Sequence, residues 1–208
     1  MEAPRPDTPY QVTAIADLAS DYSAEHFRYA IGICRSVVGK MIVEDNRSDQ
    51  QRARFRILRY VDLQLARAGQ WVEDEADLMA IVMRTLIELK FWAKFVSESE
   101  EKATQFLNEA NIDAKELYER LEKVRPADSE PMPKLPIVTG TRVSVQPSGD
   151  QEQLTWKICS KLIHPSSWGI NHFEESVQNA DTRQFLAIQV LWYGWGIVSI
   201  FHDIVWEV

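Results

Sequence analysis

The sequence is poor in the residues that bind metals or form cross-links. Its 208 residues include only two cysteines and four histidines, and the histidines show neither HxxxH nor HExxH spacing. Cys34 and Cys159 lie far apart without a CxxC pair, and the proline-rich start does not have the form of a signal peptide. We therefore expect a reduced, cytoplasmic compartment, two buried thiols without a disulfide partner, no metal ion and no other cofactor.

Glycine is also scarce, with eight residues, and no glycine-rich phosphate-binding loop is present. The chain has no internal repeat and no low-complexity tract. Basic residues are outnumbered, because 23 Lys and Arg stand against 31 Asp and Glu, which gives a net charge of -8. This charge argues against a protein that coats polyanions, so any nucleic-acid site must be a local patch.

The chain has the composition of a soluble globular protein with one sizeable core, since 45% of its residues are hydrophobic and 26% are charged. We expect a single domain over residues 1–208. Residues 1–12 should form a loose lead-in. Residues 125–149 hold five of the nine prolines, and we expect them to form a surface loop, or a hairpin that pairs 137–138 with 141–145.

Apolar side chains recur at helical spacing along the rest of the chain. A capping box at Ser48–Gln51 and predicted caps at Asn111 and Asp181 divide this pattern into segments. The segment from Leu78 to Val96 is apolar nearly all round, which places it at the centre of the fold together with the last helix. We therefore predict an all-α fold, a single-domain bundle of about five to seven helices with a proline-rich surface excursion. The predicted helices cover about 17–45, 49–69, 73–97, 99–109, 111–124, 150–164 and 183–206.

The last of these helices is apolar enough to raise the question of a membrane. The run from Phe185 to Phe201 is somewhat shorter than the roughly 20 apolar residues that a span needs, and no basic cluster flanks it. We therefore expect a buried core helix, and peripheral membrane association is only a third interpretation of the chain.

The same helix predicts a homodimer. Its apolar residues spread around more than one face, so a single neighbouring helix cannot cover them all. Gly194 and Gly196 remove side chains in the middle of the run, and closer helix packing is one gain that offsets their cost. We expect that Trp195→Glu would make the protein monomeric or unfold it.

The most informative segment for function is Ser160–Ser167, where a helical pattern stops at a histidine. Pro165 disfavours the helical conformation in the residue before it, so His164 should lie at a helix C-terminus. That position favours the charged imidazolium, which suits a proton donor or a phosphate contact and equally suits an inert cap. Ser160 lies one turn earlier, where it either forms a Ser–His pair or, as helical serines more often do, bonds the carbonyl four residues back.

Two further sets of charged residues are candidates for the site. Arg84 and Glu88 lie one turn apart on an apolar helix. They form either a structural ion pair or part of a functional pocket with His164. Arginines also form a cationic stripe that either contacts nucleic acid or is a solvated face answering nearby acids, and the solvated face is the favoured interpretation. The stripe consists of Arg52, Arg56 and Arg59.

The order of Arg-Thr-Leu-Ile-Glu at 84–88, a proline-rich excursion, Ser-Lys-Leu-Ile-His-Pro-Ser at 160–166 and a closing apolar helix resembles a family of uncharacterised bacterial all-helical proteins. That family is similar to the abortive-infection branch of the HEPN superfamily (higher eukaryotes and prokaryotes nucleotide-binding). The resemblance covers roughly 75–205 and implies a helical bundle, often dimeric, with metal-independent RNA cleavage by an Arg-x(4–6)-His motif. In this chain the six-residue spacing before His164 falls on Lys157, so lysine stands where the motif has arginine.

The function that follows is a HEPN-like, defence-associated protein that binds or cleaves RNA without metal. In this hypothesis His164 is the general acid or base, Arg84 and Lys157 stabilise the phosphoryl charge, and Glu88 orients the arginine or the histidine. The alternative is a non-enzymatic helical interaction module in which Arg84, Glu88 and His164 form a structural polar network. Residues expected to bind the substrate are Ser160, Ser166, Arg52, Arg56 and Arg59.

Overall fold

The structure is a computed structural model that describes residues 22–42, 48–73, 76–124, 143–147, 149–163 and 180–205. Within these ranges the chain forms six α-helices and no strand, which confirms the predicted all-α fold. The helices are α2 (Ala24–Met41), α3 (Asp49–Trp71), α4 (Ala76–Glu98), α5 (Glu100–Val124), α6 (Asp150–Ile163) and α9 (Ala180–Val205).

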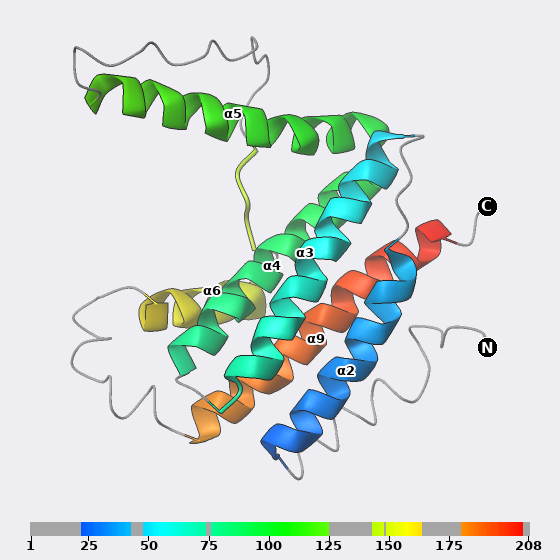
Figure 1. The fold of residues 1–208 in the computed structure, drawn as a ribbon, viewed down its shortest axis with the longest axis vertical. Helices are drawn as coiled ribbons and strands as arrows, with labels where there is room; N and C mark the ends of the chain where they lie inside the picture. The colour runs from blue at the N-terminus through cyan, green and yellow to red at the C-terminus, as the bar shows by residue number, and fades with distance from the viewer. Residues whose placement is uncertain are drawn as a thin grey trace.

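Four helices, α2, α3, α4 and α9, run side by side, while α5 lies across one end of them and α6 packs against α4 (Figure 1). The helix α4 contacts α3, α5, α6 and α9, and its most extensive contact is with α9. The prediction that α4 and the last helix form the centre of the bundle is therefore confirmed.

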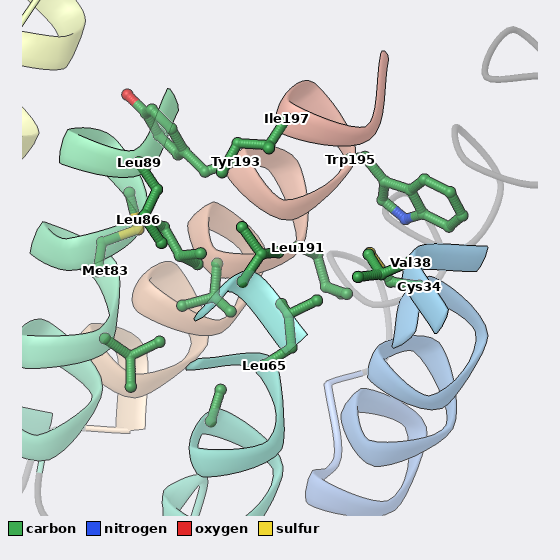
Figure 2. Close-up of a cluster of buried hydrophobic side chains, with 14 of the residues drawn as sticks. Cys34, Val38, Leu65, Met83, Leu86, Leu89, Leu191, Tyr193, Trp195 and Ile197 are labelled. Carbon is green, nitrogen blue, oxygen red and sulfur yellow. The ribbon is translucent and has the colours of Figure 1, made fainter. Parts of the chain in front are cut away.

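The core lies between α2, α3, α4 and α9 (Figure 2). Leu65 from α3, Met83 and Leu86 from α4 and Leu191 from α9 are all fully enclosed. Burying a side chain of this size stabilises the fold by roughly 1.5–3 kcal/mol relative to exposing it. The apolar surface of α4 is thus divided among several neighbours, as a nearly all-round apolar pattern requires.

Local capping accounts for where α3 begins. The hydroxyl of Ser48 accepts a hydrogen bond from the backbone N–H of Gln51 at 3.2 Å, which is one half of the predicted capping box. The reciprocal half is absent among the described residues, because Gln51 Oε1 is buried without a hydrogen-bond partner. The carboxylate of Glu100 accepts from the backbone N–H groups of Asp49 and Gln50, so the first turn of α5 supplies negative charge to the positive end of α3. The cap from Ser48 and the contact from Glu100 of α5 thus stabilise the same end of α3.

Several predicted boundaries are wrong. A single helix, α5, covers the range in which we predicted two helices, 99–109 and 111–124. Asn111 suggested a cap, but the helix-forming residues on both sides of it continue the turn. Similarly, α3 runs two residues past Gly69, and α9 begins at Ala180, so that Asp181 lies inside the helix and is not its cap.

The proline-rich excursion falls mostly outside the described residues, as do the lead-in 1–12, His164 and Ser166. Of the predicted hairpin only residues 143–145 are described, and they are not part of a strand. The backbone N–H of Val143 donates to the carboxylate of Glu109 at 2.5 Å, which joins this segment to α5. Gly149 has a positive φ of 83° directly before α6, a backbone conformation that glycine adopts without strain.

The helix α9 is the one candidate membrane span among the described residues, over Ala180–Phe201, and 56% of that stretch is buried inside the bundle. Trp195 is 7% exposed and points toward α2 (Figure 2). Replacing it therefore tests the packing of the core. Over residues 180–201 of α9, the exposed large apolar side chains are Phe185 and Trp192. The homodimer itself stays a prediction.

Candidate functional site

Arg84 and Glu88 form an ion pair within α4, with Arg84 Nε 3.4 Å from Glu88 Oε1. The guanidinium of Arg84 also lies over the ring of Trp156 in α6, 4.7 Å from its centroid. A cation placed over an indole ring in this way gains roughly 0.5–2 kcal/mol, depending on how far it is desolvated. Arg84 therefore joins α4 to α6 as well as pairing along its own helix.

The structure describes α6 as far as Ile163, and the next residue, His164, lies outside the described residues, so the predicted stop of this helix at or just before His164 stays a prediction. Trp156 lies about two turns earlier, which corresponds to roughly 10 Å along the helix axis. Arg84 thus contacts the middle of α6 and not its C-terminal end. The structure brings Arg84 and Glu88 together with Trp156, while His164 and Ser166 lie outside the described residues.

Ser160 and Lys157 do not add a reactive group to this arrangement. The hydroxyl of Ser160 donates to the backbone carbonyl of Trp156 at 2.7 Å, the bond that a helical serine commonly makes. A hydroxyl held in this way is not oriented toward a general base. Lys157 is exposed on the surface of α6.

The arginine stripe lies on the outside of α3. Arg52, Arg56 and Arg59 are all exposed. Arg52 pairs with Asp49 of its own helix, and Arg59 lies 5.8 Å from the ring centroid of Phe55. Among the described residues Arg56 and Arg59 take part in no ion pair.

Three of the acids near this stripe are engaged elsewhere. Glu73 pairs with Arg28 of α2, and Glu98 pairs with Lys102 of α5. Glu100 accepts hydrogen bonds at the start of α3. The stripe is therefore a local cationic surface on a chain whose net charge is -8.

A second polar cluster was missed by the sequence analysis. Lys90 of α4 forms an ion pair with Glu152 of α6, with Nζ 2.7 Å from Oε1, and both side chains are less than one-fifth exposed. The ammonium of Lys90 also lies 4.8 Å from the ring centroid of Tyr193 in α9. The signal in the sequence was a further charged residue, Lys90, inside a mostly apolar helix, but its partner lies on another helix far along the chain.

Burial changes the acidity of the groups around this cluster. Burial, together with the negative charge of Glu152, raises the pKa of Tyr193 to about 12. Burial also raises the pKa of the Cys159 thiol to about 12, although the positive charge of Arg84 opposes the change. Both groups therefore stay protonated at neutral pH. Neither is a nucleophile there, because the reactive form of cysteine is the thiolate.

No group of three or more His, Cys, Asp or Glu side chains is placed to hold a metal ion in the part of the chain that the structure describes. No family model, curated protein or solved structure matches this chain. What the protein does must therefore be inferred from its own residues.

Proposed function

We propose that this protein binds RNA through the outer face of α3, as a HEPN-like, defence-associated helical bundle. The observation that carries the proposal is the exposed stripe of Arg52, Arg56 and Arg59, in which Arg56 and Arg59 take part in no ion pair among the described residues. Guanidinium groups bind phosphate oxygens with two parallel hydrogen bonds, and three of them on one helix face follow a phosphate backbone. Because the rest of the chain is acidic, the contact is confined to this face.

The test is a titration of a labelled RNA oligonucleotide at several salt concentrations, followed by fluorescence anisotropy. Replacing Arg52, Arg56 and Arg59 by Gln should weaken binding and reduce the slope of log affinity against log salt by about two units. The matched control replaces three exposed lysines that lie elsewhere, Lys115, Lys123 and Lys161, by Gln. An equal loss in the control would attribute binding to net charge and would contradict the proposal.

The second part of the proposal is that the bound RNA is cut without a metal ion. Its support is in the sequence, where Pro165 disfavours the helical conformation at His164, and a histidine at a helix C-terminus is favoured in its charged imidazolium form. In this role His164 is the general acid or base on a ribose 2′-hydroxyl, and Lys157 carries the positive charge that faces the phosphoryl group. Purified protein should then cut RNA in EDTA, and His164→Ala should abolish cutting without changing the thermal melt. A wild-type protein that is inert on varied RNAs would refute cleavage but not binding.

A second candidate function is a non-enzymatic interaction module. The observation that favours it is the contact of Arg84 with both Glu88 and Trp156, which uses the arginine to hold two helices together. In that function the polar residues of α4 and α6 fix the packing and take no part in chemistry. Two measurements distinguish the candidates. RNA binding that depends on α3 supports the first, and a loss of stability when Arg84 is replaced, without RNA binding by α3, supports the second.

A further inference from the structure

The outer face of α3 carries large aromatic and apolar side chains among its arginines. Tyr60 is 46% exposed and Leu63 is 42% exposed, and helical periodicity puts both on the same side of α3 as the arginine stripe. A fourth arginine, Arg67, lies on this side as well and is partly exposed. The buried residues of α3 lie on its opposite side, where it packs against α2, α4, α5 and α9. The described part of the chain therefore leaves the outer face open to a partner.

The aromatic side chains of this helix differ in what covers their rings. The guanidinium of Arg59 lies over the ring of Phe55, 5.8 Å from its centroid, and that of Arg67 lies over the ring of Trp71 at 5.9 Å. Among the described residues neither a cation nor a second aromatic ring lies over Tyr60. The ring of Tyr60 is therefore open to a stacking partner.

Arginines lie on both sides of Tyr60 along the helix axis. Arg56 comes one turn before it, about 6 Å along the axis, and Arg67 comes about two turns after it, or roughly 10 Å. Arg56 and Arg67 take part in no ion pair within the described ranges of the chain. A nucleic-acid strand that follows α3 therefore meets a positive charge before and after the base that reaches Tyr60.

We infer that the outer face of α3 binds unpaired nucleobases as well as phosphates, and that the ring of Tyr60 stacks on one such base. This inference rests on the proposed RNA binding by the same face, and it narrows the ligand to RNA segments whose bases are unpaired. An unpaired base can leave its neighbours and stack on an aromatic side chain, whereas the bases of a duplex stay enclosed between adjacent pairs. Leu63, about one turn further along α3, extends the apolar surface beside the ring.

A lipid surface fits this face less well. Helices that lie in a membrane interface bury a continuous apolar face and keep their cations on the opposite side. The continuous apolar side of α3 is already buried in the core, where Leu58, Val61 and Leu65 are fully enclosed. Its outer face instead sets Tyr60 and Leu63 among arginines, an arrangement that suits flat bases between phosphates.

Fluorescence anisotropy with three labelled probes tests the inference. The probes are an unstructured RNA of about 15 nucleotides, its duplex with the complementary strand, and an abasic strand of the same length and phosphate number. Phosphate contacts alone favour the duplex, because its charge density is higher. We expect the wild type instead to bind the single strand about tenfold more tightly than either of the other probes at the same salt concentration.

Replacing the ring of Tyr60 should weaken binding without removing a phosphate contact. Tyr60→Ala should reduce affinity for the single strand about tenfold and leave the slope of log affinity against log salt unchanged. Tyr60→Phe keeps the ring and should bind within about twofold of the wild type. The matched control is Tyr29→Ala, which alters a tyrosine of α2 that is 72% exposed and should leave binding unchanged. Circular dichroism should show the wild-type helix content in these variants, because both tyrosines are exposed.

The outcomes separate this inference from the proposed function. If Arg52, Arg56 and Arg59 are needed for binding but Tyr60→Ala binds like the wild type, stacking is overturned and RNA binding by α3 stands. Equal affinity for the three probes, or a loss in Tyr60→Phe as large as in Tyr60→Ala, overturns stacking in the same way. A wild type that binds none of the probes refutes both. Binding to phosphatidylserine vesicles that Tyr60→Ala removes, without preference among the probes, would assign the face to a lipid surface and overturn the inference.

Discussion

Lys90 of α4 and Glu152 of α6 form an ion pair at 2.7 Å in a position where both side chains are largely excluded from water. The aliphatic part of Lys90 lies against Gly196 of α9, where a Cβ would be 3.6 Å from Lys90 Cε, and its ammonium faces the ring of Tyr193. The pair therefore connects three helices at once. A charge in such a site costs free energy unless its partner is present, so the pair determines how α6 sits on α4.

Removing one partner of this pair should destabilise the fold. Glu152→Gln leaves Lys90 partly buried without a full counter-charge, and we expect the free energy of unfolding in urea to fall by about 1–3 kcal/mol. The double variant Lys90→Met/Glu152→Met removes both charges and should recover most of that loss. Lys157→Gln, at an exposed position of the same helix, is the control and should change the value by less than about 0.5 kcal/mol. A Glu152→Gln protein as stable as the wild type would show that solvent screens the pair.

Arg84 should prove to be a packing residue. Arg84→Met keeps a long apolar side chain beside Trp156 but removes the charge, so the free energy of unfolding should fall by about 1 kcal/mol through loss of the cation–π contact and the pair with Glu88. RNA affinity should not change, because α3 carries the proposed contact. The two measurements are a urea titration and the anisotropy titration. A loss of affinity of tenfold or more with unchanged stability would instead place Arg84 in a binding site.

The features that the sequence predicted are local ones. The Ser48 cap and the back-bonded hydroxyl of Ser160 each depend on residues within about one turn, and the structure confirms them. The features that it missed depend on distant partners. Glu152 lies 62 residues from Lys90, and the enclosure of Trp195 depends on how α9 packs against the rest of the bundle. Spacing along one helix cannot show which neighbour covers which face.

Stability should fall in alkaline solution because of Tyr193 and Cys159. Burial raises the pKa of each group to about 12 in the folded chain, whereas an unfolded chain has values near 10 for tyrosine and roughly 8.5 for cysteine. Between those values and pH 12 the unfolded chain loses protons that the folded chain keeps. Below about pH 8 these two groups therefore do not change the free energy of unfolding. Above about pH 8 they lower it as the pH rises.

Urea titrations from about pH 8 to pH 11 measure this decrease. Tyr193→Phe should make the decrease shallower above about pH 10, because phenylalanine has no proton to lose. Tyr29→Phe is the matched control, since Tyr29 is 72% exposed and its replacement should leave the pH dependence unchanged. Identical slopes for Tyr193→Phe and the wild type would contradict a buried phenol.

The two glycines in the middle of α9 should respond differently to alanine. A Cβ added at Gly194 would lie 3.1 Å from Leu65 Cδ2 and 3.4 Å from Cys34 Sγ, in a fully packed part of the core. Leu65 and Cys34 would have to move, and such overpacking commonly costs about 1–3 kcal/mol. At Gly196 the nearest atom is Lys90 Cε at 3.6 Å, an ordinary van der Waals contact with a flexible side chain.

Alanine gains about 1 kcal/mol over glycine in a helix interior, so Gly196→Ala should be stabilised by roughly that amount. In Gly194→Ala the same gain is opposed by the crowding against α2 and α3, and we expect a net loss of about 1 kcal/mol. The two variants differ from the wild type by the same methyl group on the same helix, so the difference between their urea midpoints isolates the packing effect. Equal midpoints would mean that α9 does not approach α2 and α3 as closely at Gly194 as the structure places it.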